Sequence, residues 1–465
     1  MLTAGPGVTN GVSAMTSAHF NGSPLVVFGG RAPAARWGAG SLQEFDHPPV
    51  LAPITKLSAT VTDSGTAAER VHAAARLATQ PHRGPVFLDF PLDLFGPAAG
   101  DVPEQGAAAG EAPDPDAVER LSALVASAER PAFLVGSDAY WDGAWDELRA
   151  AAEALGVPCF FNGLGRGLLP PDHPLAFMRT RAVLKERADL VVVIGTPLDF
   201  RVGYGRFGNA PVAHVVDAAS KAAGHVEVPT VAGDIAATLR GIAEYAGDRV
   251  DHAAWIAELR TRENAETSAE RELLAADSDP IKPTRVYGEL RKRLAPDAVV
   301  VCDGGDFVSY AGKYVEVHQP GTWLDTGPYG CLGNGLGYAI AARTVRPDSQ
   351  VVVLLGDGAA GFSLMDVDTL VRHDLPVVMV VGNNGMWGLE KHPMQMIYGW
   401  DVACDLRPDT RYDEVVAALG GAGETVTRPS DIGPALDRAF ASNVPYLVNV
   451  MTDPSDVYPR TSNLA

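Results

Sequence analysis

The 465-residue sequence has few cysteines and no recognisable secretion signal. Its only cysteines are Cys159, Cys302, Cys331 and Cys404. None has a second cysteine at metal-site spacing, and a chain of this length needs no disulfide bonds to stabilise its core. The opening residues, MLTAGPGVTNGVSAM, lack the basic and apolar segments of a signal peptide. We therefore expect reduced thiols and a cytoplasmic protein.

Long hydrophobic runs and an excess of positive charge are also missing. No apolar run approaches the roughly 20 residues that a membrane-spanning helix needs. The formal net charge of −20 at pH 7 argues against nucleic acid or an anionic membrane as the main partner. A solvated acidic surface accounts for this charge. A phosphorylated ligand stays compatible with it if local amides, a metal ion or a few arginines hold the ligand.

Short apolar runs and helix-like stretches alternate along the chain in three blocks. This pattern predicts parallel sheets covered by helices on both faces, that is, three doubly wound α/β domains. We place the domains at 1–110, 116–245 and 284–465, with a linker-like segment at 105–115 and helices at 67–78, 145–155 and 253–274. The expected strands cover residues 24–28, 85–90, 132–135, 158–161, 190–194, 213–216, 298–302, 351–355, 375–381 and 446–451.

The sharpest local signal is Gly356-Asp357-Gly358, directly after an apolar strand. A helix-like stretch at 362–372 follows, and the next strand ends before Asn383 and Asn384, so that 25 residues lie between Gly358 and Asn384. This βαβ order puts Asp357 and Asn384 at the carboxyl ends of parallel strands, where open α/β sheets bind ligands.

These residue types suit a magnesium–diphosphate ligand. Mg²⁺ prefers hard oxygen ligands and keeps substrate phosphates among them. The Asp357 carboxylate, the Asn384 amide oxygen and a backbone carbonyl would leave room for diphosphate oxygens and water. Gly358 would let the chain approach a phosphate, and the following helix N-terminus would offer free amides. Because a GDG tripeptide alone is common in turns, the inference depends on the spacing.

The order GDG then NN resembles the signature of thiamine-diphosphate-dependent enzymes, and further similarities run along the chain. Segments resembling the family's pyrimidine-binding, central and diphosphate-binding domains lie at 5–10 (GPGVTN), 41–44 (SLQE), 55–56 (TK), 83–91 (RGPVFLDFP), 195–199 (GTPLD), 216–217 (VD) and 327–333 (GPYGCLG). The chain most resembles acetolactate synthases of an actinobacterial kind. 2-Hydroxyacyl-CoA lyases and oxalyl-CoA decarboxylases are near neighbours.

The resemblance implies roles for individual residues. Asp357 and Asn384 would bind the metal through side chains, and Met386 through its carbonyl. Gly330 would accept a hydrogen bond from the 4′-amine of the aminopyrimidine, and Leu332 would wedge between the two cofactor rings. The residues near the diphosphate would be Asp306, Phe307, Gly356, Gly358 and Ala359, and those near the substrate Gln43, Lys56, Trp387 and Glu390. Core packing for Leu332 and Trp387, a plain turn for Asp306 and Phe307, and a surface charge for Lys56 are the alternatives.

The family's catalytic carboxylate has no counterpart in this sequence. In relatives a glutamate upstream of the GPG loop contacts N1′ of the aminopyrimidine and makes the 4′ nitrogen a base, but here the loop begins at Gly5. We expect the first domain to lack roughly 60–90 residues, at about 30 per βαβ unit. We also expect the isolated chain to be destabilised or aggregation-prone. A fragment or mis-assigned start and a short protein that has lost catalysis both stay open.

The resemblance implies a reaction and an assembly for the complete enzyme. Pyruvate would be decarboxylated and joined to a second 2-oxo acid, giving 2-acetolactate or 2-aceto-2-hydroxybutyrate, in branched-chain amino acid biosynthesis. The cofactors would be thiamine diphosphate and Mg²⁺, held between the first domain of one subunit and the third of another in a homodimer or homotetramer.

Several points stay open at this level. The central domain of relatives holds FAD, ADP or neither, and the candidate contacts here are Arg179, Arg181, Arg201 and Asp217. One alternative function is a 2-hydroxyacyl-CoA lyase or oxalyl-CoA decarboxylase, although the short tail, with Arg460 as its one base, disfavours it. The other is a non-catalytic protein that binds the cofactor.

Overall fold

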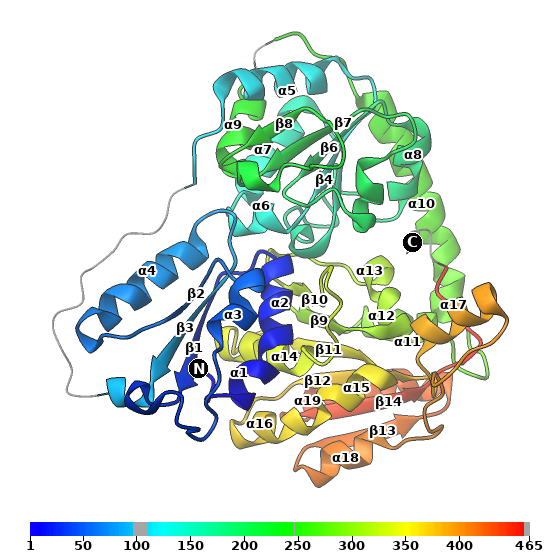
Figure 1. Ribbon diagram of the computed structural model, residues 1–465. Coiled ribbons are helices and arrows are strands. Elements are labelled where there is room, and N and C mark those ends of the chain that lie inside the picture. Colours follow the sequence, from blue (N-terminus) through cyan, green and yellow to red (C-terminus); the bar gives the residue numbers. More distant parts are fainter. Residues whose placement is uncertain (96–109, 246, 460–465) are drawn as a thin grey trace.

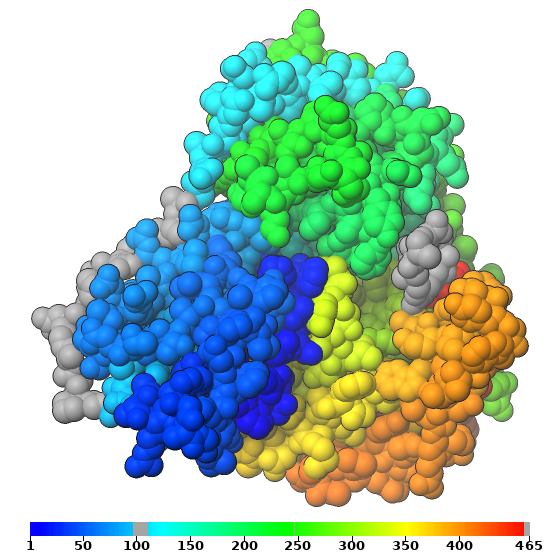
Figure 2. All heavy atoms as spheres, viewed as in Figure 1, coloured from blue at the N-terminus to red at the C-terminus, as the bar shows by residue number. Residues whose placement is uncertain are grey.

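The computed structural model describes residues 1–95, 110–245 and 247–459. It contains three parallel sheets, one for each block of the sequence, and each sheet packs against helices (Figure 1). The three blocks abut one another in the space-filling view (Figure 2). Residues 105–109 of the expected linker, and Arg460, lie outside the described residues.

The first sheet has the strand order β1-β3-β2. Its strands are β1 (Leu25–Arg31), β2 (Leu57–Thr60) and β3 (Pro85–Pro91), and a bridge from Leu2 to Gly29 adds to the β1 edge. Two apolar clusters cover its faces, one packed around Met15 of α2 (Val12–Phe20) and the other around Ala74 and Ala78 of α4 (Ala67–Thr79).

The central sheet has the order β5-β4-β6-β7-β8. Because helices cover both faces, its strands are continuous apolar runs. The strands are β4 (Pro131–Val135), β5 (Cys159–Phe161), β6 (Leu190–Ile194), β7 (Val212–Val216) and β8 (Thr230–Ala232). Helices α5 (Pro115–Ser127), α7 (Trp145–Leu155) and α9 (Ile235–Ala243) cover one face, and α8 (Leu184–Arg187) and the start of α10 (Ala253–Ala275) cover the other.

The third sheet has the order β10-β9-β11-β12-β14-β13, with every pair parallel. Its strands are β9 (Val299–Asp303), β10 (Trp323–Asp325), β11 (Val351–Gly356), β12 (Val378–Asn383), β13 (Ala422–Val426) and β14 (Tyr446–Met451). Helices α11 (Pro283–Leu290) and α19 (Pro429–Ala441) pack on one face, and α14 (Gly335–Val345) and α16 (Val367–Arg372) on the other.

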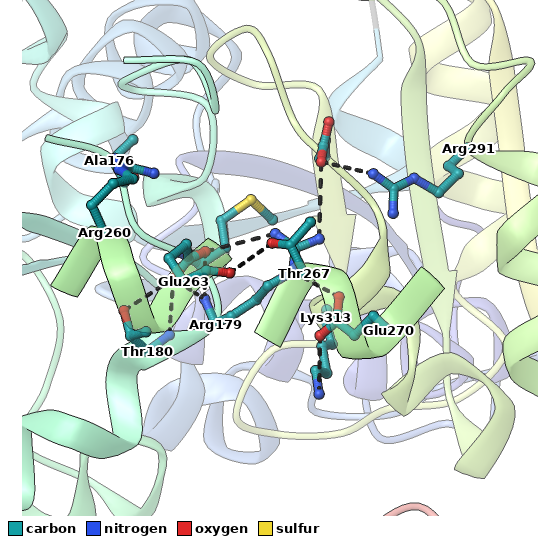
Figure 3. A network of polar contacts seen from close by, with 12 residues as sticks. Ala176, Arg179, Thr180, Arg260, Glu263, Thr267, Glu270, Arg291 and Lys313 are labelled. Atoms are coloured by element: carbon teal, nitrogen blue, oxygen red, sulfur yellow. Dashed lines mark hydrogen bonds and ion pairs between the residues drawn. The ribbon is translucent and has the colours of Figure 1, made fainter. Parts of the chain in front are cut away.

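Helix α10 joins the central block to the third block through buried polar contacts (Figure 3). Glu263 accepts hydrogen bonds from the backbone amides of Met178, Arg179 and Thr180 at 3.0 to 3.1 Å. Two turns later, Glu270 accepts one from Arg179 Nε at 2.7 Å and pairs with Lys313 of the third block at 3.1 Å. The helix therefore fixes how these two blocks sit together.

The expectation for the segment after Gly356 is wrong in one respect. Helix α15 (Asp357–Ser363) begins at Asp357 itself, a short 3-10 turn follows, and α16 completes the crossover. Because Asp357 is therefore the first residue of a helix, its carboxylate is held within the turn where strand and helix meet.

In the described ranges, no helix is long and apolar enough to cross a membrane.

Candidate cofactor site

A cavity of about 330 Å³ lies at the carboxyl end of the third sheet. It sits where the chain leaves β9 and β11, and the strand order reverses between these two neighbours. Such a switch point is where open α/β sheets bind ligands. The lining residues are Gly305, Asp306, Phe307, Leu332, Gly356, Asp357, Gly358, Ala359, Gly382, Asn384, Met386, Trp387, Gly388 and Glu390.

Asp357 is a buried acidic residue of this cavity, with 3% of its surface exposed. Its two carboxylate oxygens accept hydrogen bonds from the backbone amides of Gly358 at 2.9 Å and Gly385 at 2.7 Å. Burial raises the pKa of Asp357 to about 6, against the opposing effect of the amide hydrogen bonds. Among the described residues no Lys, Arg or His forms an ion pair with this carboxylate. Its buried charge therefore calls for a cation.

The turn after β12 presents the second polar ligand. Asn384 lies beside Asp357 because β11 and β12 are paired in register, with Gly356 opposite Gly382. The Asn384 side-chain oxygen accepts a hydrogen bond from the Met386 amide at 3.2 Å. Gly385, with φ of +70°, provides the left-handed residue that this tight turn needs. The turn brings the Met386 backbone to the same cavity.

Glycines shape the cavity by admitting bulky side chains. A Cβ on Gly358 would lie 2.6 Å from the Trp387 ring, and a Cβ on Gly382 would lie 2.2 Å from Phe307. A Cβ on Gly304 would lie 1.9 Å from Leu332. The Trp387 indole is therefore the nearest neighbour on the side where a Gly358 Cβ would lie, and the approach of a phosphate to Gly358 stays a prediction.

Asp303 supports the loop that carries Leu332, and the sequence analysis missed it. Its two oxygens accept hydrogen bonds from the Gly333 and Gly335 amides, both at 2.9 Å. Burial raises the pKa of Asp303, against these two hydrogen bonds. The sequence does show an acidic residue at the end of an apolar strand. However, the amides that Asp303 binds lie about 30 residues later in the chain, and only the folded structure brings them together.

The predicted residues fall into two groups. All those of the third block except Gly330 line the cavity. Gly330 is exposed, in the same loop as Leu332. Gln43 is exposed on the first block, against the Gly5 loop. Lys56 donates hydrogen bonds to the carbonyls of Gln80 and His82, and burial lowers its pKa.

A second cavity, of about 590 Å³, lies in the central block and reaches Val317 of the third. Of the candidate dinucleotide contacts, only Arg181 lines it. Arg179 is engaged by Glu270, Arg201 pairs with Asp199 at 2.7 Å, and Asp217 faces His82. Whether the central domain holds FAD, ADP or neither stays open.

A buried carboxylate, an amide oxygen and a cavity at a switch point are typical of an α/β protein that binds a ligand at the carboxyl edge of its sheet. The particular class follows from comparison with known families, because this chain belongs to the thiamine pyrophosphate enzymes. It matches the N-terminal thiamine pyrophosphate binding domain over residues 1–50, the central domain over 118–242 and the C-terminal thiamine pyrophosphate binding domain over 303–450.

Individual relatives cover almost the whole chain. The acetolactate synthase large subunit IlvG of Mycobacterium tuberculosis and a probable acetolactate synthase of Mycobacterium bovis are each 49% identical over 472 residues, covering 100% of this chain and 86% of the relative. The 2-hydroxyacyl-CoA lyase 2 of Caenorhabditis elegans is 33% identical over 98% of this chain and 80% of its own length.

A solved structure shows the same fold. It is a putative thiamin diphosphate-dependent enzyme from Mycobacterium smegmatis, with a TM-score of 0.81 and 22% identity over 97% of this chain and 87% of that one. The expected three-domain α/β architecture of the thiamine-diphosphate type is confirmed. The domain limits 1–110, 116–245 and 284–465 stay predictions.

Proposed function

We propose that this protein is a thiamine-diphosphate-dependent enzyme that joins 2-oxo acids, with pyruvate as donor and 2-acetolactate as product. The observation that carries the proposal is the 49% identity to two mycobacterial acetolactate synthases along the whole chain. The cavity supports it, because the residues that the family resemblance assigns to cofactor and metal, except Gly330, come together there.

The residues present fit thiamine diphosphate with Mg²⁺. The unpaired Asp357 carboxylate and the Asn384 amide oxygen are hard oxygen donors of the kind that Mg²⁺ takes, and Met386 would add its carbonyl. The diphosphate would lie over the start of α15, near Gly356, Gly358 and Ala359, with Asp306 and Phe307 on the β9 side. The helix N-terminus favours an anion at that place.

The bound cofactor would supply the electron sink for decarboxylation, and the chain would supply position and shape. Leu332 projects from the loop held by Asp303 and would keep the two rings of the cofactor bent. Trp387 and Glu390, which also line the cavity, would face the reacting end and limit the size of the acceptor. Gln43 and Lys56 would act only if the first block of a second subunit covered the cavity.

The proton relay is a step of this proposal separate from cofactor binding. Residues 1–43 contain no Asp or Glu. The resemblance requires a carboxylate at N1′ of the aminopyrimidine, so we propose that catalysis by the chain as given is impaired. The binding of cofactor and metal does not depend on that carboxylate, which allows binding and activation to be measured separately.

The test is hydrogen–deuterium exchange at C2 of bound thiamine diphosphate, with Mg²⁺ and without substrate. We expect the Asp357→Asn variant to bind the cofactor about 100-fold more weakly, because a metal ligand is lost. Asp368→Asn, an exposed aspartate of α16, is the matched control and should bind normally. Binding with exchange no faster than in free cofactor is the expected result for the chain as given. Undiminished binding by Asp357→Asn would contradict the metal site.

A second candidate is cleavage of a 2-hydroxyacyl-CoA. The relative that favours it is the 2-hydroxyacyl-CoA lyase 2 of Caenorhabditis elegans, at 33% identity. Formation of an aldehyde and a one-carbon acyl-CoA from a 2-hydroxyacyl-CoA, with no acetolactate from pyruvate, would favour this candidate over the first. Release of CO₂ from oxalyl-CoA would instead indicate oxalyl-CoA decarboxylation. Binding of the cofactor without turnover of any of these substrates would indicate a non-catalytic role.

A further inference from the structure

Three metal-ligating side chains meet where the first block touches the central block. His82 lies in the segment between α4 and β3, Asp138 in the first turn of α6 (Ser137–Trp141), and Asp217 directly after β7. One ligand atom from each lies within 4.8 Å of the other two. This group, the His82 cluster, is outside the cofactor cavity and has no part in the proposed reaction.

The cluster is compact and buried. His82 Nδ1 lies 3.1 Å from both carboxylate oxygens of Asp217 and 3.8 Å from Asp138 Oδ1. The exposed fractions of the side chains are 13% for His82, 9% for Asp138 and 1% for Asp217. Ligands placed tetrahedrally at about 2.1 Å from a metal ion are about 3.4 Å apart. The separations of His82 from the two carboxylates bracket that value.

Among the described residues, the contacts of Asp138 do not account for the burial of its carboxylate. Across the described parts of the chain, no donor lies within hydrogen-bond distance of its carboxylate, although the side chain is nine-tenths buried and faces His82. The nearby Arg83 is committed elsewhere, since its Nη1 donates to Asp142 at 2.6 Å and lies 4.0 Å from Asp217. A buried carboxylate without a donor is costly unless a cation compensates it.

We propose that His82, Asp138 and Asp217 bind one divalent transition-metal ion, with Zn²⁺ as the best match. An imidazole nitrogen with two carboxylates is a borderline ligand set that suits Zn²⁺, Co²⁺ or Mn²⁺, whereas Mg²⁺ and Ca²⁺ take oxygen ligands. Water would complete the coordination.

The ion would clamp the first block to the central block. His82 also supports the turn after α2, because a Cβ on Gly22 would lie 2.9 Å from its ring. In that turn the Asn21 carbonyl accepts a hydrogen bond from the Trp141 indole at 3.3 Å, and the Asn21 side chain lies against Gly327 of the third block. Gly327 opens the loop that carries Leu332. A metal at the His82 cluster would therefore fix a series of contacts, through the turn after α2 and Gly327, that reaches the cofactor cavity.

A dinucleotide is the competing occupant of this place. The cluster lies at the carboxyl ends of β4 and β7, where a doubly wound sheet can hold a nucleotide. However, the carboxylates of Asp138, Asp142 and Asp217 converge there and would repel a diphosphate. The Asp138 backbone amide also cannot bind a phosphate, because it already donates a hydrogen bond to the Gly195 carbonyl at 2.9 Å. The chemistry of the site favours a cation.

The test is Co²⁺ binding to the full chain carrying Asp357→Asn, stripped of metals and free of thiamine diphosphate. This background removes the other candidate cation site. We expect one Co²⁺ per chain after gel filtration, visible d–d absorption, and a melting temperature a few degrees higher with Co²⁺. Asp138→Asn, nearly isosteric, and His82→Ala should each weaken Co²⁺ binding at least 30-fold. His225→Ala, at an exposed histidine of the central block, should change nothing.

Other outcomes would overturn the proposal. These are no retained Co²⁺, or retention that is unchanged in Asp138→Asn. Flavin absorption in the purified protein, or stabilisation by ADP that Asp138→Asn abolishes, would assign the place to a nucleotide instead. If His82→Ala fails to fold, the comparison between Asp138→Asn and His225→Ala still decides the question.

Discussion

At the scale of single residues, the cofactor cavity depends on pairs formed by a glycine and a bulky side chain. Gly358 lies under the Trp387 indole, Gly382 under Phe307 and Gly304 under Leu332. In each pair the bulky member lines the cavity. Its position is therefore set by a residue that has no side chain, and a single added methyl group should move it.

Gly358→Ala tests this dependence. The new Cβ would lie 2.6 Å from the Trp387 ring, and Gly358 has no positive φ, so the clash is with the ring and not with the backbone. We expect a loss of about 1–3 kcal/mol in the free energy of unfolding, from overpacking. In a Trp387→Ala background the same change should cost at least about 0.5 kcal/mol less. Urea unfolding of the four proteins measures both values, and equal costs in the two backgrounds would contradict the pairing.

The sequence was sufficient to predict the positions of residues that directly follow a strand. It was not sufficient to predict contacts between residues that lie far apart along the chain. Asp357 and Asn384 could be placed together because they end neighbouring strands of one βαβ unit. The amides bound by Asp303, and the ring above Gly358, could not be foreseen because those contacts depend on side-chain packing across the loops. Leu332 lines the same cavity as Asp357 and its role as a wedge stays a prediction, whereas Lys56 is held by two backbone carbonyls of its own block.

At the scale of elements, α10 acts through the Glu263 carboxylate, which accepts the amides of three consecutive residues (Figure 3). Glu263→Ala would leave these buried amides without an acceptor, so we expect a loss of about 3 kcal/mol in the free energy of unfolding. Glu263→Gln keeps one acceptor oxygen and should lose less. Glu266→Ala, at an exposed position on the same helix, is the control. Denaturant midpoints measure all three, and equal midpoints for Glu263→Ala and Glu266→Ala would show that the amides find other partners.

Helix α11 carries a pH-dependent element. Burial raises the pKa of Glu289, but hydrogen bonds from Lys292, Arg285 and Arg293 outweigh it and lower the pKa to about 2 from an ordinary 4.5. Because the folded-state pKa is depressed, the ionised group stabilises the fold above pH 4.5, and this contribution is lost as the pH falls towards 2. We expect the melting temperature of Glu289→Gln to lie below that of the parent at pH 7.

The difference should shrink as the pH is lowered from 4.5 towards 2, since the parent then loses the same charge. Melting curves across this range measure it. Glu272→Gln, at an exposed position on α10, should show no difference at any pH. A gap between Glu289→Gln and the parent that stayed constant with pH would mean that shape, not charge, determines the role of Glu289.

The strands that the sequence did not predict share one property. They are β2, β8, β10 and β13, which are short and carry few apolar residues, as in AGETV for β13. Each of the four has at most one buried position and lies at an edge of its sheet, so the pattern of a continuous apolar run does not apply. The central strands, buried along their length, were predicted to within a few residues.

At the scale of the whole molecule, contacts between blocks converge on the loop that carries Gly330 and Leu332. Phe20 of α2 stacks on Tyr329 with ring centroids 5.5 Å apart, and Asn21 lies against Gly327. The third block contributes the cavity, and the first block contributes contacts to the loop that carries Leu332, one of the lining residues. A cavity whose lining is supported in this way responds to how the blocks are held together, which is why α10 and the His82 cluster affect it.

The surface beside the cavity is more apolar than an isolated chain needs. Phe362 and Met365, on α15 and the turn after it, are each 66% exposed, and the Phe362 ring lies 6.0 Å from that of Trp387. Exposed apolar side chains next to a binding cavity are typical of an interface. We therefore predict that a second copy covers this surface, in a homodimer or homotetramer, and completes the cofactor site.

The double variant Phe362→Asp with Met365→Asp should shift the protein to monomer in sedimentation velocity and weaken thiamine diphosphate binding at least tenfold, because charges would be buried at the contact. Leu124→Asp, at an exposed leucine of the central block, should leave both unchanged. Both the oligomeric state and the cofactor affinity must be measured. A monomer that still binds the cofactor normally would show that the cavity is complete within one chain, and then Gln43 and Lys56, which lie away from it, could have no part in the reaction.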